Sequence, residues 1–182
     1  MKTDKELYKE FLNGEKSSFE ELVLRHKNNL IYFIARYIKD INIAEDISQD
    51  VFVYILLNKE KYDFDFSFKT YIYMIGKSRA INYLKRERRI VDIEQIESMC
   101  LYDEEIEKDI FQKEDIRYLK KAINKLKTDY QVVIYLLDIE GYSYKEVAKI
   151  MEKTVIQIKT LAFNARKRLK EICKKEVSLN EG

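Results

Sequence analysis

Apolar residues recur at helical spacing along most of the chain, and residues able to cap a helix precede many of the apolar runs. In a capping box, Ser or Thr precedes the first turn and Glu or Gln follows three residues later, so that each side chain binds an exposed amide. This pattern or a close variant predicts helix starts at Ser18, Asn42, Ser67, Thr128, Ser143 and Thr154. The expected helices are 4–12, 18–40, 42–58, 68–89, 128–141, 143–151 and 154–172. The sequence therefore predicts an all-α fold.

Helix-breaking residues are scarce, with four glycines and no proline in 182 residues. Two of the glycines have a predicted role, because glycine readily adopts the left-handed conformation that ends a helix. We expect Gly14 to close the first helix and Gly141 to close the helix that begins near Thr128.

The last two expected helices are separated by only two or three residues, which is the spacing of a helix-turn-helix. Ala148 allows the two helices to cross closely, and Ile158 and Leu161 are expected to pack on Val147 and Ile150. The opposite face of the second helix presents Gln157, Lys159, Thr160, Phe163, Asn164 and Lys167. Such a face can enter the major groove of DNA.

The turn of this helix pair has Glu152 where glycine is usual. A residue with a side chain is strained by about 1 kcal/mol at positive φ. We therefore expect the turn to differ slightly from the usual one.

Positive charge is concentrated on the second helix of the pair. The whole chain carries a net charge of +2, but residues 154–172 hold five basic residues and one acidic residue. A basic helix face is often merely solvated. Its position on the second helix of a capped pair favours an interaction with DNA phosphates.

A strongly acidic segment precedes this region, since residues 92–115 contain ten acidic and two basic residues. Helical periodicity is weak in its first half, and a connection this long is uncommon inside one compact domain. We interpret residues 91–112 as an acidic linker between two small helical domains, although an ordinary solvated loop has the same composition.

The expected helix over 68–89 has two distinct rows. Its inward row contains Phe68, Tyr71, Ile72 and Ile75. Its second row is polar and then basic, with Ser78, Asn82, Lys85, Arg86 and Arg89. Basic residues beside aromatic ones suit single-stranded nucleic acid, because bases stack on rings while the backbone meets positive charge. Each aromatic residue could equally belong to the core.

Several classes of protein are disfavoured. The chain has no apolar run of about 18 residues and no apolar stretch at its N-terminus, so we expect it to remain in the cytosol. Cys100 and Cys173 are expected to be free thiols, and the single histidine, His26, is expected at the surface or a boundary. Glycine-rich phosphate-binding motifs are absent. We expect no enzyme activity, cofactor or metal site.

Three stretches together resemble the extracytoplasmic-function class of bacterial sigma factors. They are AEDISQDVFVYIL at 44–56, FSFKTYIYMIGKSRAINYLKRERR at 66–89, and INKLKTDYQVVIYLLDIEGYSYKEVAKIMEKTVIQIKTLAFNARKRL at 123–169. The resemblance extends from Phe19 to Leu169 and has a linker in the expected place. It implies region 2 at 1–90, the acidic linker at 91–112, region 4 at 113–176 and a tail at 177–182.

The resemblance also implies roles for individual residues. Core RNA polymerase would be bound by Asp46, Gln49 and Asp50. The opened minus-ten DNA, with one base captured by the loop at 62–68, would be bound by Asp65, Phe66, Ser78, Asn82, Lys85 and Arg86. The minus-thirty-five DNA would be bound by Gln157, Lys159, Thr160, Phe163, Asn164, Arg166 and Lys167.

Some positions depart from the family pattern. The family often has Asn at the position of Ser78, Asp at that of Asn82 and Trp at that of Tyr71. Arginine is common where Leu161 and Asn164 stand, so fewer side chains can bind guanine with two hydrogen bonds. We therefore expect unusual promoter preferences.

Other partners and functions remain open. The resemblance implies an anti-sigma factor that covers the DNA and polymerase faces, and an acidic linker that lies in the path of RNA. Asp46 and Asp50 could instead favour the dipole of their own helix. The alternative functions are a stand-alone helix-turn-helix regulator that binds duplex DNA without polymerase, and a helical adaptor whose basic faces bind acidic proteins.

Overall fold

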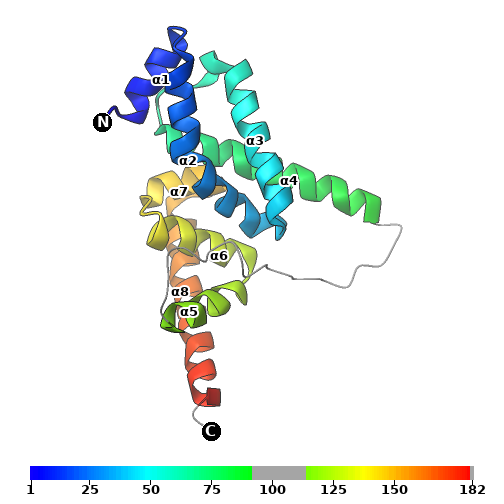
Figure 1. The fold of residues 1–182 in the computed structure, drawn as a ribbon. Coiled ribbons are helices and arrows are strands. Elements are labelled where there is room, and N and C mark those ends of the chain that lie inside the picture. The colour runs from blue at the N-terminus through cyan, green and yellow to red at the C-terminus, as the bar shows by residue number, and fades with distance from the viewer. Residues whose placement is uncertain (92–113, 181–182) are drawn as a thin grey trace. The chain divides into compact units, whose positions relative to one another are not determined.

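The computed structural model describes residues 1–91 and 114–180, and in these residues the regular structure is entirely helical (Figure 1). They form two compact units. The first is built on α1 to α4, and the second contains α5, α6 and α8, with α7 connecting α6 to α8 along the chain. None of the described helices is long and apolar enough to cross a membrane. The predicted all-α fold is confirmed.

In the first unit, α2 (Lys16–Ile38) lies between α1 (Asp4–Leu12) and α3 (Ile41–Leu57) (Figure 1). The chain then makes a short 3-10 turn (Lys59–Lys61) and enters α4 (Phe68–Val91), which packs on both α2 and α3. The core consists of side chains from all four helices, among them Leu7, Tyr8, Leu22, Leu30, Phe33, Val51, Ile55, Phe68, Ile72 and Tyr73.

A glycine brings α4 close to α2. A Cβ atom at Gly76 would lie 3.0 Å from Cδ1 of Leu30 and 3.4 Å from two side-chain atoms of Ile34. Any larger residue would therefore push the two helices apart or force these core side chains to move.

The starts of α2 and α3 differ from the predicted ones. We expected a cap at Ser18, but α2 begins at Lys16, where the Glu15 carboxylate accepts a hydrogen bond from the Ser17 amide. The Ser18 hydroxyl instead donates to Glu10 of α1, at 2.6 Å. We expected another cap at Asn42, but the Asp40 carboxylate accepts from the Asn42 and Ile43 amides.

His26 was expected at the surface or a boundary, and that prediction is wrong. Its ring is buried, and Nε2 lies 2.6 Å from the Asp4 carboxylate of α1. The hydrogen bond from His26 lowers the pKa of Asp4, as does the neighbouring Arg25. The pair ties α1 to α2, which a single helical pattern in sequence does not reveal.

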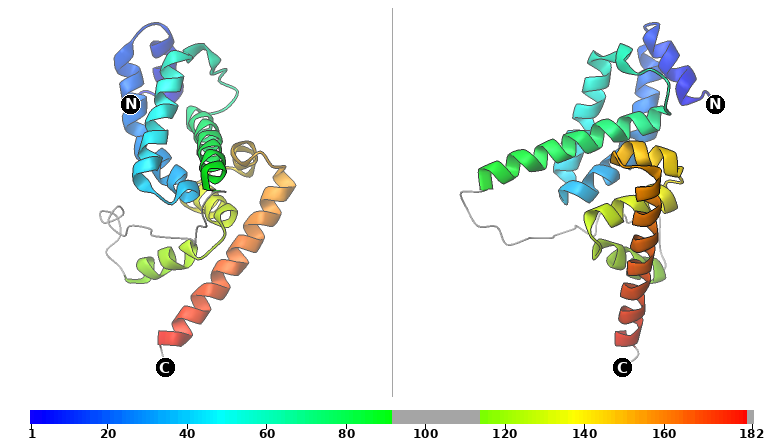
Figure 2. Two further views of the ribbon diagram at one scale, coloured as in Figure 1. Left: turned by 90° about the vertical axis from the view of Figure 1, so that its right-hand side faces the viewer. Right: turned by 180° about the vertical axis from the view of Figure 1, so that it is seen from behind.

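The second unit begins with α5 (Glu114–Asn124) and α6 (Thr128–Ile134), which continues as a π-helical segment (Tyr135–Ile139). The helix-turn-helix consists of α7 (Tyr144–Met151) and α8 (Val155–Asn180). Helix α8 packs on α5 and α6 and extends well beyond the predicted end at residue 172 (Figure 2).

The capping predictions in this unit had mixed outcomes. The Ser143–Glu146 box forms, with hydrogen bonds of 2.9 and 3.3 Å, and so does the Thr154–Gln157 box, with 2.8 and 3.2 Å. The capping box predicted at Thr128 does not form. The side-chain amide of Gln131 is buried and donates to the Asn124 and Leu126 carbonyls instead.

The expected helix ends at glycine are confirmed, since Gly14 and Gly141 follow the C-caps Asn13 and Glu140 with left-handed φ of 102° and 71°. Helix α4 starts at its predicted position, with Ser67 Oγ accepting from the Thr70 amide at 3.1 Å. Cys173 is a free thiol, as predicted. Cys100 and nearly all of the predicted acidic linker lie outside the described residues.

Candidate nucleic-acid and protein interfaces

The acidic candidates on α3 share one exposed face. Asp46, Gln49 and Asp50 are all exposed, and their spacing of three and four residues places them side by side on the helix. Because α3 starts at Ile41, Asp46 and Asp50 lie beyond its first turn. The helix dipole acts mainly within that turn, so the dipole explanation for these acids is weakened.

The same face continues into an apolar patch that the sequence analysis missed. Val53, Leu56 and Leu57 are 52%, 47% and 76% exposed. The core residues of α3 could have revealed them, because a helix that buries Val51 and Ile55 turns positions 53, 56 and 57 outwards. We call this surface, from Asp46 through Asp50 to Leu57, the α3 face.

One residue of α4 borders the α3 face. Arg79 lies with its guanidinium nitrogen 3.6 Å from the Asp50 carboxylate and with Cζ 5.3 Å from the centre of the Tyr54 ring. The Asp50 side chain is 68% exposed, so this ion pair contributes little to stability and leaves the carboxylate accessible.

The loop between the 3-10 turn and α4 has a defined conformation. Burial raises the pKa of Tyr62 to about 12, so its hydroxyl stays protonated and donates to the Phe66 carbonyl at 2.6 Å. The Asp65 amide donates to the Asp63 carboxylate at 3.1 Å. Phe64 has a left-handed backbone with φ of 63°, which is unfavourable for a bulky residue unless neighbours hold it.

Aromatic contacts hold this loop against α1. The Tyr8 ring lies 4.7 Å from the Tyr62 ring and 5.8 Å from the Phe64 ring, both in edge-to-face geometry. The hydroxyl of Tyr8 also donates to the Lys59 carbonyl at 2.8 Å. Each such aromatic pair adds about 1 kcal/mol beyond its area burial.

A hollow of about 450 Å³ opens between the loop and the start of α1. It is lined by the N-cap Thr3 and the first two residues of α1, by Tyr62, and by residues 64–68, which include the candidates Asp65 and Phe66. Lys5 adds a positive charge, with its ammonium 5.9 Å from the centre of the Phe64 ring. The part played by α1 was not predicted, because it depends on a contact between distant segments.

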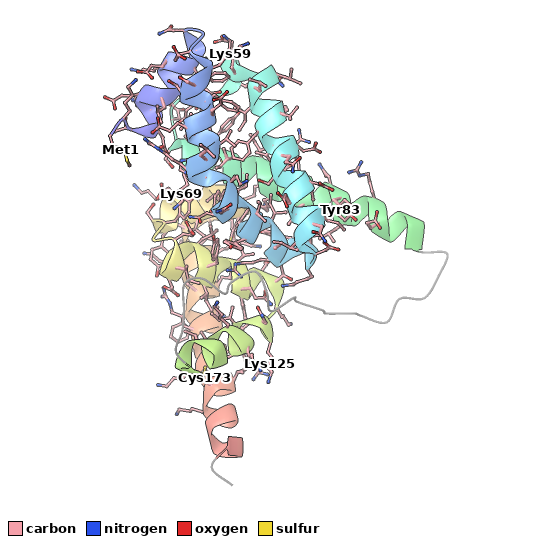
Figure 3. All side chains as sticks on the ribbon, viewed as in Figure 1. Met1, Lys59, Lys69, Tyr83, Lys125 and Cys173 are labelled. Atoms are coloured by element: carbon pink, nitrogen blue, oxygen red, sulfur yellow. The ribbon has the colours of Figure 1, made fainter. Side chains whose placement is uncertain are left out.

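The predicted basic row of α4 is accessible. Ser78, Asn82, Lys85 and Arg86 are exposed; Asn82 follows Ser78 by four residues, and Lys85 and Arg86 follow Asn82 by three and four. Tyr83, labelled in Figure 3, marks this part of the helix. The side chain of Arg89 lies outside the described part of the chain. Of the predicted inward row, Phe68 and Ile72 are buried, whereas Tyr71 and Ile75 are partly exposed.

The candidate face of α8 is also accessible. Its exposed members are Gln157, Lys159, Thr160, Phe163, Asn164 and Lys167. The sequence analysis missed Ile156, which is 77% exposed and lies on the same face, two turns before Phe163. Val147, Ile150 and Ile158 are buried as expected, and Leu161 is partly exposed. The expectation that this turn would differ is wrong, because Glu152 adopts φ of 54° and the helix-turn-helix keeps the left-handed turn despite the side chain.

Arg166 differs from the other α8 candidates because it already has a partner. Its guanidinium donates to both carboxylate oxygens of Asp138, at 2.5 and 3.1 Å, and lies 3.4 Å from the Tyr144 hydroxyl. The hydrogen bond to Asp138 raises the pKa of Arg166. A phosphate contact by this residue would have to share or replace the ion pair.

Models of known protein families match one stretch in each half of the chain. Residues 22–90 match the family model for sigma-70 region 2, and residues 116–169 match the model for sigma-70 region 4. The RNA polymerase sigma-H factor of Pseudomonas aeruginosa is 27% identical and is aligned over 90% of both chains. The ECF RNA polymerase sigma-E factor of Haemophilus influenzae is 29% identical, with 90% of this chain and 92% of the relative covered.

A solved structure shares the fold. The sigma factor RpoE of Bartonella quintana, crystallised with the anti-sigma factor NepR, has a TM-score of 0.71 and 24% sequence identity. The match covers 86% of this chain and 96% of RpoE. Two sigma-70 region models match the chain and sigma-H and sigma-E relatives align with 90% of it, so the chain belongs to the sigma-70 family, as an extracytoplasmic-function (ECF) RNA polymerase sigma factor.

Proposed function

We propose that this sigma factor directs core RNA polymerase to specific promoters through three surfaces with separate tasks. The observation that carries the proposal is that the α3 face, the loop with the α4 row, and the α8 face are each exposed and differ in chemistry. We assign residues 1–90 to polymerase binding and minus-ten opening, 91–112 to the linker, 113–176 to minus-thirty-five recognition and 177–182 to a tail.

The α3 face is the proposed docking surface for core polymerase. Asp46 and Asp50 can accept charge-assisted hydrogen bonds from arginines of the partner, and Gln49 lies beside them. Leu56 and Leu57 form an exposed apolar cluster. Clusters of this kind on a protein surface typically mark a site of interaction with a partner.

The loop and the α4 row are the proposed site for opened minus-ten DNA. A base turned out of the stack can enter the hollow near Asp65 and Phe66, while Lys85 and Arg86 contact the strand backbone. Ser78 and Asn82 can form hydrogen bonds with bases or sugars along the row. Unstacking a base costs a few kcal/mol, so polymerase contacts must also contribute.

The α8 face is the proposed reader of the minus-thirty-five duplex. In a helix-turn-helix, the second helix lies in the major groove and its first turns contact base edges. Lys159, Thr160, Phe163 and Asn164 occupy those turns, and Gln157 and Lys167 flank them. Arg166 would contact a phosphate at the margin of the site.

Partners besides polymerase and DNA follow from the same assignment. The relative in the Bartonella structure is bound by an anti-sigma factor, which supports an inhibitory partner for this chain. The acidic linker is proposed to lie in the RNA path of the polymerase until transcript displaces it. The polymerase performs the chemistry, so this chain needs no catalytic residue or cofactor of its own.

Run-off transcription tests the proposal directly. Genomic fragments are transcribed by bacterial core polymerase with and without this protein, and the start sites are mapped. We expect new start sites that depend on the protein and share two spaced promoter elements. Identical start sites in both reactions would refute the proposal, and specific duplex binding without polymerase would support a stand-alone regulator instead.

The linker assignment has its own test. Neutralising its acidic residues should change the ratio of abortive to full-length transcripts at the mapped promoters. An unchanged ratio would remove the linker from the mechanism and leave the other assignments intact.

A further inference from the structure

The centre of the α8 face is apolar rather than charged. Ile156 and Phe163 are 77% and 68% exposed and lie two turns apart on one side of the helix. Thr160 lies between them, four residues after Ile156 and three before Phe163. We call these three residues the apolar stripe. Side chains three, four and seven residues apart form a continuous row on a helix.

The hydroxyl of Thr160 faces its own helix. Its Oγ1 donates to the Ile156 carbonyl at 3.1 Å, which is the common back-bonding of threonine inside a helix. The hydroxyl is thereby satisfied, and the methyl group is what Thr160 offers to a partner. The stripe therefore presents three hydrocarbon groups in succession.

The arginines of the described part of α8 lie beyond the stripe and are engaged with carboxylates. Arg166 binds Asp138, and Arg168 donates to Glu171 at 2.9 Å. Between Val155 and Asn164 the single basic residue is Lys159. Guanine is bound most often by the two-pronged arginine side chain, so the stripe is poorly equipped to select a run of G·C pairs.

The chemistry of the stripe fits thymine. Thymine carries a C5-methyl group in the major groove, and threonine methyl groups and phenylalanine rings are among the usual contacts of that group. The exposed amide of Asn164 follows Phe163 directly and can bind both N6 and N7 of adenine. One face of α8 thus carries groups complementary to both halves of an A·T pair.

We propose that the apolar stripe of α8 recognises thymine methyl groups, so that the upstream duplex element contains at least one A·T pair whose methyl group contacts Phe163. This inference depends on the proposed function, because it requires α8 to enter the major groove of duplex DNA. It adds the class of base pair that the site selects.

Replacing thymine with deoxyuridine tests the inference, because this change removes the methyl group and leaves base pairing intact. Duplexes that bind the complete holoenzyme are first selected from a random pool and sequenced. Each thymine of the upstream element is then replaced singly, and holoenzyme affinity is measured by competition. Losing one buried methyl contact should weaken binding about fourfold at the thymine facing Phe163.

Variants identify the side chain responsible. Phe163→Ala should bind the thymine duplex more weakly and should no longer distinguish it from the deoxyuridine duplex. Ile156→Ala should reduce discrimination at a neighbouring thymine. The matched control is Ile139→Ala, since Ile139 is 58% exposed but lies outside α8, and it should retain the full effect.

The outcomes separate the inference from the proposed function. Specific selection of a duplex element without thymine overturns the inference alone, as does equal affinity for every deoxyuridine duplex. Fourfold discrimination that persists in Phe163→Ala overturns the assignment to the stripe. Failure of the holoenzyme to select any sequence overturns both the inference and the proposed function.

Discussion

The α3 face and the α8 face have a similar arrangement of residues but carry opposite charge. Each is one side of an amphipathic helix, and each exposes large apolar residues, Leu57 on α3 and Phe163 on α8. The neighbours are acidic on α3, where Asp46 and Asp50 stand, and basic on α8. In the proposed complexes the apolar residues would supply contact area in both cases, and the sign of the adjacent charge favours a cationic protein surface for α3 and DNA for α8.

Reversing a charge on the α3 face should have the largest effect. Asp50→Arg places a positive charge beside Arg79 and opposite the proposed arginines of polymerase. Because like charges across an interface cost several kcal/mol, affinity for core polymerase should fall about 100-fold. Binding is measured by fluorescence anisotropy of labelled protein.

Glu20→Arg is the matched control for this variant, because Glu20 is an exposed acid on α2 and the charge change is identical. It should bind core polymerase normally. Equal losses in the two variants would indicate a general charge effect and would remove the α3 face from the proposed interface.

The apolar part of the α3 face can be tested separately. Leu57→Ser should weaken core binding about tenfold, because a leucine that is exposed in the free protein would no longer be buried on assembly. Leu24→Ser is the control, since Leu24 is 74% exposed and Leu57 is 76% exposed. Both variants should keep the melting temperature of the parent, and equal core affinity in both would contradict the prediction.

The next prediction concerns Lys159, a basic residue of the α8 face. Lys159→Ala should reduce use of the upstream element about fivefold and lower the salt dependence of promoter binding by about one counterion. Core binding should persist, whereas Asp50→Arg should show the reverse pattern. Lys9→Ala, an exposed lysine on α1, is the charge-matched control. If Lys159→Ala and Asp50→Arg lose the same property, the two faces do not have separate tasks.

The smallest expected effect concerns the acid stability of the first unit. The pKa of Asp4 is lowered from its ordinary 3.8, chiefly by the hydrogen bond from His26. Its stabilising contribution is therefore present above that value and is lost as the pH falls through the lower pKa of the folded state. Asp4→Asn should cost about 1 kcal/mol at neutral pH and flatten the loss of stability below about pH 4.

Urea denaturation at several pH values, followed by helical circular dichroism, measures this effect. Glu20→Gln provides the control, because it neutralises an exposed acid on α2. An unchanged acid profile in Asp4→Asn would show that the contact between Asp4 and His26 does not stabilise α1.

The helix caps show what local sequence can predict. The boxes at Ser143 and Thr154 form as predicted, and both helix starts were predicted correctly. The predictions at Ser18 and Thr128 were wrong because tertiary contacts recruited the side chains, Ser18 to α1 and Gln131 to the end of α5. Local pattern identified the helices, but their first residues were changed by neighbouring carboxylates at Glu15 and Asp40 and by the more distant contacts of Ser18 and Gln131.

The candidate surfaces show a related limit. Polar candidates were recognised from motif and spacing, and the described ones proved accessible, but the exposed apolar residues Leu57 and Ile156 were overlooked. An apolar residue in a helical pattern is assigned to the core unless the packing of its neighbours is known. The role of α1 in lining the hollow beside the loop likewise depends on contacts between residues far apart in sequence.

The left-handed backbone of Phe64 has a consequence for the proposed opening of minus-ten DNA. Contacts of the Phe64 ring with Tyr8 and Tyr62 hold the loop in one defined shape, so the entropy of ordering it is lost during folding. Under the proposed function, a base that leaves the duplex would meet a receptor that is already assembled. Capture would then require no rearrangement of the loop, and the lifetime of the unpaired base would limit the rate of opening.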